Sequence, residues 1–295
     1  MLMTRVRPLS LLLLAAPARS ALLRHAQLAA TAETRRRAFS SCSAGSPEAP
    51  AKQFLIDNSN NNVERLLCPT TAVVQQGISE TATLPQICIA GESNAGKSSL
   101  INHLLHKKSL AKASSVAGKT RSVDMMLVNE RIVVTDLPGL PSRDGQVTQM
   151  WETTWRPLVF NYIRDCDNLL AMLYVHDVRW KVSPRVREFL AEVRDHQLPV
   201  LLVLTKDDRL LGEIGPNDTS PDAVHHLRQR LMRRTRKALS FDGVHVHYST
   251  NNDLPASRKA RRRLLRYIES IVGAGSRGET AKLLDAIAAD KFAQL

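Results

Sequence analysis

A glycine-rich stretch in the first half of the chain contains the residue types that bind phosphate. Residues 91–98 read Gly-Glu-Ser-Asn-Ala-Gly-Lys-Ser, which matches the pattern G-x-x-x-x-G-K-[ST], and they follow the apolar run 86–90. In this pattern the glycines let backbone N–H groups turn toward the phosphates, the lysine reaches the outer phosphates, and the serine hydroxyl can bind Mg²⁺. A helix that begins near the lysine adds its positive end. We therefore expect a nucleotide site, whose base the pattern leaves open, formed by Gly91, Glu92, Ser93, Asn94, Ala95, Gly96, Lys97, Ser98 and Ser99.

Two stretches further along the chain could supply the metal ligands and the contacts to the last phosphate. Asp136-Leu137-Pro138-Gly139 follows the apolar run 132–135. A carboxylate there can hold Mg²⁺ through water, and the Gly139 N–H can meet the γ-phosphate. Thr120, in the polar stretch 117–121, can complete the Mg²⁺ shell while the γ-phosphate is present and leave it after hydrolysis. We predict that Ser98, Thr120 and Asp136 bind Mg²⁺ and that Lys97, Thr120 and Gly139 act in catalysis.

A third stretch indicates which base is bound. Thr205-Lys206-Asp207-Asp208 follows the apolar run 199–204. The carboxylate of Asp208 can accept two hydrogen bonds from the edge of guanine, and adenine lacks that pair of donors. The stem of Lys206 would cover the base. Ser249-Thr250 follows another strand-like run, where a small polar turn could touch the base, although such turns are common. We expect GTP as the substrate, with its base contacted by Thr205, Lys206, Asp208, Ser249 and Thr250.

The elements that must position these residues are indicated by alternating apolar runs. Runs of strand length occur at 86–90, 125–128, 132–135, 169–175, 199–204 and 243–248, with helical spacing in the segments between most of them. This alternation predicts βαβ units and a three-layer α/β/α fold with a mostly parallel six-stranded sheet. Only three residues separate the runs 125–128 and 132–135, which is too few for a crossover helix. These two runs should form an antiparallel hairpin at one edge of the sheet.

The two ends of the chain differ from this alternating region. The first 32 residues contain four arginines and no acid, together with a leucine-rich run at 9–14. Such a composition is typical of a mitochondrial transit peptide. A secretory signal is the competing interpretation, but arginines continue beyond the apolar run, which is also too short to span a membrane. We expect a transit peptide over 1–40, a flexible linker over 41–62, a GTPase domain over 63–272 and a mobile or partner-bound tail over 273–295.

The charge of the chain favours a polyanionic partner. The 295 residues carry a formal charge of +13, and because residues 1–50 hold seven of the 41 basic and two of the 28 acidic residues, the remainder keeps +8. Such an excess is unusual for an enzyme that acts only on small solutes. Much of it lies in two helix-like clusters, Arg228, Arg230, Arg233, Arg234, Arg236 and Lys237 in the first and Arg258, Lys259, Arg261, Arg262, Arg263 and Arg266 in the second.

These clusters contain almost no acidic residue, which favours contact with an RNA backbone over a solvated helix face. Aromatic residues make up only 4% of the chain and do not interleave with the clusters, so contact with phosphates and RNA shape is favoured over base stacking. The four cysteines and nine histidines show no spacing of a disulfide framework or a zinc site.

The stretches GESNAGKSSLIN, AGKTR, DLPG and TKDDRL, with Asp177 and Arg179 after the fourth apolar run, together resemble the EngB family of ribosome-assembly GTPases. The resemblance covers residues 84 to about 272. It implies a Ras-like P-loop fold, binding of GTP and Mg²⁺, slow hydrolysis and a role in maturing the large ribosomal subunit. The chain departs from the family pattern at Ala117, where proline is usual, and over 122–126, where Asn-Phe-Phe is usual.

Two residues bear on the rate of hydrolysis. Ras uses a glutamine after Asp-x-x-Gly to orient the attacking water, whereas here Leu140 follows Gly139 and cannot hydrogen-bond water. Intrinsic hydrolysis should therefore be slow. GTPases similar to this chain that have asparagine at the position of Asn94 use it to help hold K⁺ in place of an arginine finger. The resemblance thus implies K⁺ as a further cofactor, although an ordinary loop asparagine fits the sequence equally well.

With its arginine-rich leader, the chain resembles a GTP-driven switch of the mitochondrial matrix. The expected partners are a precursor of the mitochondrial ribosomal subunit, its rRNA and assembly factors, and we expect a monomer in the free state without a transmembrane segment. One alternative is a non-hydrolytic structural assembly factor, which the intact Lys97, Ser98, Asp136 and Asp208 disfavour. A membrane-remodelling or protein-targeting GTPase is disfavoured by the lack of a membrane-spanning run.

Overall fold

The computed structural model describes residues 55–57, 61–108, 110–111, 122–141, 145–213, 221–251 and 254–290. All of them belong to one compact unit, Gln53–Leu295. The predicted transit peptide over 1–40 lies outside the described residues. Among the helices of the described part, none is both long and apolar enough to cross a membrane.

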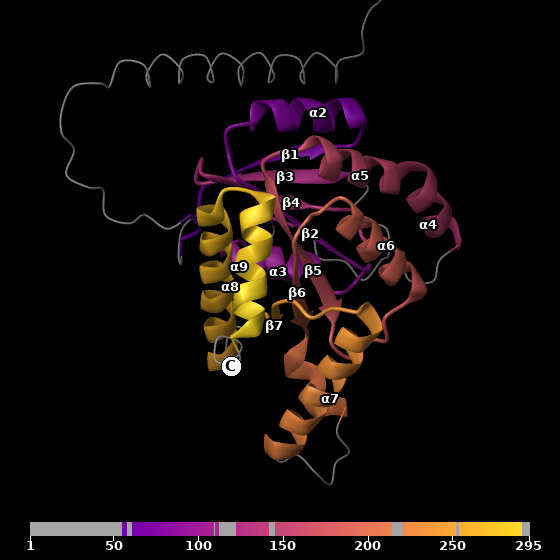
Figure 1. Ribbon diagram of the computed structural model, residues 1–295, viewed down its shortest axis with the longest axis vertical. Coiled ribbons are helices and arrows are strands. Elements are labelled where there is room, and N and C mark those ends of the chain that lie inside the picture. Colours follow the sequence, from indigo (N-terminus) through magenta and orange to yellow (C-terminus); the bar gives the residue numbers. More distant parts are fainter. Residues whose placement is uncertain are drawn as a thin grey trace, which may run out of the picture. The chain divides into compact units, whose positions relative to one another are not determined.

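In the described part of this unit, a seven-stranded sheet forms the centre (Figure 1). The strand order is β1-β3-β4-β2-β5-β6-β7. Neighbours from β4 through β2, β5 and β6 to β7 run parallel, whereas β1, β3 and β4 pair in antiparallel fashion. The strands are β1 (Val63–Cys68), β2 (Gln86–Gly91), β3 (Val123–Val128), β4 (Ile132–Asp136), β5 (Leu169–Asp177), β6 (Val200–Thr205) and β7 (His245–His247).

The six predicted strands and the hairpin of β3 with β4 are confirmed, but the hairpin does not form the edge of the sheet. The edge is β1, an additional strand that pairs along β3. Three of its six side chains, those of Glu64, Arg65 and Leu67, are exposed. Its apolar pattern is therefore too weak to show in the sequence. An ion pair between Arg65 and Asp124 of β3 also joins the two strands.

Helices cover both faces of the sheet and complete the predicted three layers. One face carries α3 (Lys97–Leu104), α8 (Pro255–Ala274) and α9 (Arg277–Ala289), whose apolar residues share one core cluster. The other face carries α2 (Thr71–Glu80), α5 (Arg156–Asp165), α6 (Pro184–Asp195) and α7 (Pro221–Leu239), which share the second cluster. Three short elements complete the described part: α4 (Gly145–Met150), the π-helix η1 (Trp151–Trp155) and the 3₁₀-helix η2 (Asp207–Glu213).

The central strands bring the candidate residues to one end of the sheet, where the parallel strands finish. Every residue of β2 and β5 is buried, as expected for strands of a parallel sheet that is covered on both faces. Because β2, β4, β5, β6 and β7 are parallel, their carboxyl ends lie at the same end of the sheet. In sheets of this kind, ligands bind in the crevice outside those carboxyl ends.

The packed unit begins earlier in the chain than the sequence predicts. Residues 41–62 were expected to form a linker, yet the described part of that stretch contains the buried side chains of Ile56 and Asn61. The Asn61 amide donates to the carbonyl oxygens of Asp57 and Leu105, and its own carbonyl accepts from the Asp57 N–H. An asparagine in a polar run can thus be a buried connector, which composition alone does not indicate.

The predicted tail is also packed over its described part. Helix α8 continues to Ala274 and ends at Gly275, whose φ of 75° suits glycine at a helix end. In α9, Leu284 is buried against the same core as α8. The guanidinium of Arg277 donates to four carbonyl oxygens, those of Ile163, Cys166, Leu169 and His196. Residues 277–289 are therefore part of the folded unit and not a mobile tail.

Candidate nucleotide site

The phosphate loop connects β2 to α3, as predicted, and two of its glycines are required by the backbone. Gly91 has a φ of 150°, and a Cβ atom there would lie 2.2 Å from the carbonyl oxygen of Val175 on β5. Gly96 has a φ of 104° and precedes the first turn of α3. Between them, Asn94 also has a positive φ, of 67°. Ser98 and Ser99 lie in the first turn of α3 with half-buried side chains. The loop therefore presents a helix N-terminus, which attracts phosphate.

Lys97 lies over this loop with its side chain buried. Its Nζ donates to the carbonyl oxygens of Gly91 at 2.9 Å and Glu92 at 3.1 Å. Burial lowers the pKa of Lys97, and the nearby Asp136 and Glu92 carboxyl groups raise it in part. A Cβ atom at Gly139 would lie 2.9 Å from the Lys97 Nζ, so the Gly139 backbone lies against the loop. The structure thus brings the two described residues of the predicted catalytic set together.

Asp136 ends β4 as a buried carboxyl group. Its Oδ1 atom has no hydrogen-bond partner among the described residues. Burial raises the pKa of Asp136 to about 7, although Lys97 acts in the opposite direction. A buried and unpartnered carboxylate oxygen is costly unless something pairs with it. The donor chemistry here fits Mg²⁺, which binds carboxylate and hydroxyl oxygens, so Asp136 and Ser98 would hold it.

The stretch Thr205–Asp208, called the guanine stretch from here on, contacts the phosphate loop through Thr205 and Lys206. The Thr205 hydroxyl lies close to the carbonyl oxygens of Ala95 and His176. Lys206 has a φ of 59°, and its Nζ donates to the Asn94 carbonyl oxygen at 2.7 Å. The same Nζ lies 3.1 Å from the Asp177 carboxylate and 5.2 Å from the centre of the Trp180 ring. Loop and guanine stretch therefore form one connected surface.

The two aspartates that follow differ in their contacts. Asp208 is half-buried, has no hydrogen bond or ion pair with a described residue, and its contact with a base stays a prediction. Asp207 instead pairs with Arg228 of α7 and His247 of β7. No local pattern in the sequence indicates this pairing, because the partners lie 21 and 40 residues away. Asp207 is thus a residue of the site that sequence reasoning missed.

Ser249 and Thr250 follow β7, at the end of the sheet where the parallel strands finish. Ser249 is buried, and its hydroxyl oxygen accepts from the Asn251 N–H at 3.1 Å. Thr250 is exposed. Their contact with a base stays a prediction. Thr120 lies outside the described residues, and so does its predicted place in the Mg²⁺ shell.

Two loop side chains lie differently from a simple phosphate cradle. The Glu92 side chain is buried beneath the loop, where its Oε1 accepts from the Ser183 hydroxyl at 3.2 Å and its Oε2 lies 3.8 Å from the His176 Nδ1. Burial raises the pKa of Glu92. Only the backbone of Glu92 can therefore contact the nucleotide. The predicted role of Glu92 in nucleotide binding is thus limited to its backbone. Asn94 has an exposed side chain, and its binding of K⁺ stays a prediction.

Leu140 is fully buried and pairs with the loop through its backbone. Its N–H donates to the Gly91 carbonyl oxygen at 3.1 Å, and its own carbonyl accepts from the Ser93 N–H at 2.8 Å. The side chain packs in the same core cluster as α5 and α6. It points away from the phosphate-binding surface and cannot orient a water molecule.

The basic clusters are less exposed than the sequence suggests. On α7, Arg228 binds Asp207, Arg234 donates to the carbonyl oxygens of Arg179 and Trp180, and Arg236 donates to that of Phe241. On α8, Arg261 is buried and donates to the carbonyl oxygens of His103 and Leu104 at the end of α3. These arginines tie helices to the domain. Eight cations on the two helices are exposed, Arg234 among them: Arg230, Arg233, Arg234, Lys237, Arg258, Lys259, Arg262 and Arg266.

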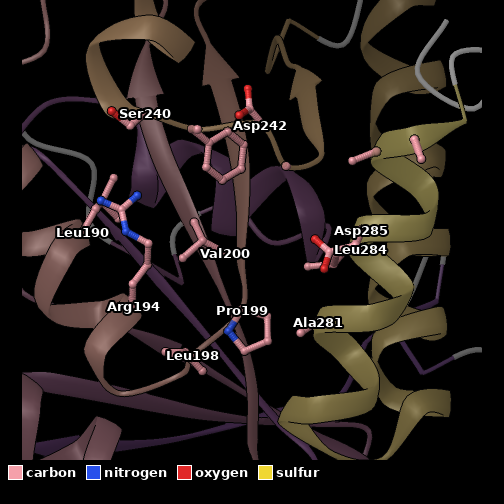
Figure 2. Close-up of a pocket in the computed structure, with 14 residues that line it drawn as sticks. Leu190, Arg194, Leu198, Pro199, Val200, Ser240, Asp242, Ala281, Leu284 and Asp285 are labelled. Carbon is pink, nitrogen blue, oxygen red and sulfur yellow. The ribbon is translucent and has the colours of Figure 1, made fainter.

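The described part also contains a cavity of about 570 Å³ that is separate from the phosphate loop. It lies beside the start of β6, at the opposite end of that strand from Thr205, and α6 and α9 form its walls. Figure 2 shows Arg194 and Asp285 on opposite sides of it, with Val200 between them. None of the predicted nucleotide residues lines this cavity.

Comparison with known proteins gives consistent matches. Residues 86–206 match the family described as "50S ribosome-binding GTPase". The chain is 35% identical over 141 residues to "Probable GTP-binding protein EngB" of Desulfitobacterium hafniense (strain DSM 10664 / DCB-2), an alignment that covers 48% of this chain and 69% of that protein. It is also 35% identical over 127 residues to the protein of the same name from Protochlamydia amoebophila (strain UWE25), covering 43% of this chain and 61% of the relative.

Several curated relatives, including the last, are spanned over about three fifths of their length, with 60% to 65% covered. Among solved structures, the one described as "Crystal structure of a probable GTP-binding protein engB" aligns with a TM-score of 0.44 and 18% identity. That alignment covers 63% of this chain and 98% of that chain.

Proposed function

This chain belongs to the EngB family of GTP-binding proteins, and we propose that it is a slowly hydrolysing GTP switch built on a Ras-like P-loop fold. The observation that carries the proposal is the direct attachment of the guanine stretch to the phosphate loop through Thr205 and Lys206. This attachment holds a base site and a phosphate site at a fixed separation, as recognition of one nucleotide requires. Bound Mg²⁺ would neutralise phosphate charge, with Asp136 and Ser98 as its ligands.

Hydrolysis in this site would rely on position more than on a reacting side chain. Lys97 and the Gly139 backbone lie together where the last phosphate would bind, and both can stabilise its charge. The buried Leu140 supplies no group that orients water. We therefore infer a slow intrinsic rate that depends on conditions or on a partner.

The test is phosphate release from GTP by the full chain, with and without ribosomal large-subunit particles, beside Lys97→Ala. We expect slow release that particles accelerate and that the variant loses. The rival function is a structural assembly factor that binds GTP without hydrolysing it, which the missing water-orienting side chain favours. Nucleotide binding without phosphate release under any condition would support that rival.

K⁺ is the further cofactor that we propose, with the exposed Asn94 side chain as one ligand. A monovalent cation beside the phosphates would supply positive charge that no described arginine of the loop provides. We expect faster hydrolysis in K⁺ than in Na⁺ at equal ionic strength, and loss of that difference in Asn94→Ala. Equal rates in the two salts would exclude this role for K⁺.

We also propose that the protein acts in the mitochondrial matrix on the large ribosomal subunit, as a monomer when free. The arginine-rich, acid-free composition of residues 1–32 supports the location, and the description of the matched family supports the ribosomal partner. Fractionation of cells and sedimentation of the protein with mitochondrial ribosomal particles test both points. Recovery in another compartment would contradict the proposal.

The proposed surface for rRNA is the exposed face of α8. Arg258, Arg262 and Arg266 are exposed and spaced four residues apart, so they line one face of the helix. Removing one contact between an arginine and a phosphate should reduce the slope of log affinity against log salt by about 0.7 to 0.9. Arg258→Gln, Arg262→Gln and Arg266→Gln combined should therefore reduce both affinity for rRNA and this slope. The control combines Lys181→Gln with Arg187→Gln, two exposed cations outside both clusters, and should leave them unchanged.

A further inference from the structure

Asp207 lies between Lys206 and Asp208 of the guanine stretch, and its side chain contacts α7 and β7. Both of its carboxylate oxygens accept from Arg228 of α7, from Nε at 2.8 Å and from Nη2 at 2.7 Å. The Nδ1 atom of His247 on β7 lies 3.0 Å from Oδ1. This carboxylate therefore joins three elements, η2, α7 and β7, that are remote from one another in the sequence.

The geometry of these contacts restricts how the carboxylate can turn. Two parallel hydrogen bonds from a guanidinium set the plane of a carboxylate, and the third partner limits rotation about that plane. Burial raises the pKa of Asp207, but the hydrogen bonds from His247 and Arg228 lower this pKa by more than burial raises it. The resulting pKa is about 2. Asp207 is thus ionised over the whole physiological range.

The backbone around Asp208 is held on both sides. Before it, Lys206 is bound to the Asn94 carbonyl oxygen in a left-handed conformation, and the Asp207 side chain is fixed by Arg228 and His247. After it, the Arg209 N–H donates to the Lys206 carbonyl oxygen at 3.0 Å and closes the turn. The direction in which Asp208 leaves the backbone is therefore determined by its neighbours, since Asp208 itself has no partner among the described residues.

We propose that Asp207, held by Arg228 and His247, is a positioning residue that orients Asp208 toward guanine. This inference rests on the proposed binding of GTP and adds the residues that set its specificity. It also makes α7 part of the nucleotide site, because Arg228 projects from that helix. Recognition of the base then depends on a helix that lies outside the phosphate loop and outside the guanine stretch.

The test measures the affinity of GDP and GTP for the full chain by competition with a fluorescent guanine nucleotide. Asp207→Asn and Arg228→Gln should each weaken binding about tenfold, and Arg228→Lys, which keeps the charge but not the two-pronged contact, should have a smaller effect. Arg233→Gln is the matched control, an exposed arginine on the same helix, and should bind as the unaltered chain does. Thermal unfolding confirms that each variant is folded.

The decisive comparison repeats Asp207→Asn in an Asp208→Ala background. If Asp207 acts by orienting Asp208, its removal should change affinity less than about twofold once Asp208 is gone. The same tenfold loss in both backgrounds, or no loss in the native one, would overturn the inference while leaving GTP binding intact. An unaltered chain that binds no guanine nucleotide would instead overturn the proposed function, and the inference with it. Should Asp207→Asn fail to fold, His247→Gln and Arg228→Gln are tested instead, each in the native background and in the Asp208→Ala background.

Discussion

Leu140 shows how one buried side chain limits the chemistry of a site. Its position directly follows Gly139, which lies against Lys97, so a polar side chain there would be expected to face the last phosphate. Instead the backbone pairs with Gly91 and Ser93, and the side chain joins the core. The restriction comes from the backbone direction as well as from the residue type. Replacing the residue alone should therefore not restore a water-orienting group.

Leu140→Gln should accordingly not accelerate hydrolysis. The amide would enter an apolar core, so we expect a loss of about 2 kcal/mol in the free energy of unfolding and no increase in phosphate release. Urea unfolding and single-turnover hydrolysis measure the two quantities. Leu140→Met conserves the apolar character and should cost less than about 1.5 kcal/mol. A rate increase of tenfold or more at unchanged stability would show that the side chain can reach the phosphates.

At the residue scale, the groups whose chemistry is local could be predicted from the sequence. Lys97, Asp136, Thr205 and Lys206 lie where their motifs predict, because each motif consists of a strand end and the turn after it. Asp207 could not be identified in this way, since its role depends on partners from α7 and β7. The buried direction of the Glu92 side chain also depends on β5 and α6, which the loop sequence does not encode.

At the scale of elements, Arg261 illustrates a cation with a structural role. It projects from α8 and donates to the carbonyl oxygens of His103 and Leu104, which end α3, and to that of Asp57. The last carbonyls of a helix have no partner within the helix, and a cation near them is favourable. Arg261 therefore joins α8 to the helix that begins at the phosphate loop.

Arg261→Gln should lower the free energy of unfolding by about 3 kcal/mol, because several charge-assisted hydrogen bonds to buried carbonyls are removed together. Its neighbour Arg262 is exposed, so Arg262→Gln should change stability by no more than about 0.5 kcal/mol. Chemical denaturation of the two variants side by side makes the comparison. Equal losses would mean that Arg261 contributes only as a surface charge.

The strands were predictable because parallel strands covered on both faces appear as continuous apolar runs, as β2 and β5 do. The edge strand β1 lacks such a run, since three of its six side chains are exposed. Helix α9 lies in the segment 273–295, for which the sequence predicts a mobile or partner-bound tail. Its packing depends on Arg277, whose four carbonyl acceptors come from distant segments that no local pattern reveals.

For the whole molecule, the acid sensitivity of folding follows from a buried histidine. Burial lowers the pKa of His245 to about 4, and the nearby His247, Arg236 and Arg263 add to the effect. The ordinary pKa of 6.5 applies in the unfolded chain. Between these values the unfolded chain binds a proton that the folded chain does not. Stability from this group is thus complete above pH 6.5 and is lost as the pH falls toward 4.

His245 should account for about 2 kcal/mol of the stability that is lost between pH 7.5 and pH 5. His245→Asn removes the titrating group. Between pH 7.5 and pH 5, the free energy of unfolding of this variant should therefore fall by about 2 kcal/mol less than that of the unaltered chain. Because the substitution also changes packing, the comparison uses the pH dependence and not the absolute stability. Parallel pH profiles for the two proteins would rule out this contribution.

For the molecule as a whole, we propose that the carboxyl ends of the parallel strands form a GTP site in which Asp208 binds the base. The most direct measurement is single-turnover phosphate release from GTP, ATP and xanthosine triphosphate in saturating Mg²⁺, by the full chain and by Asp208→Asn. We predict release from GTP but not from ATP by the unaltered chain, and a shift of preference to xanthosine triphosphate in the variant. An unchanged preference in Asp208→Asn, or equal release from ATP and GTP, would contradict the claim.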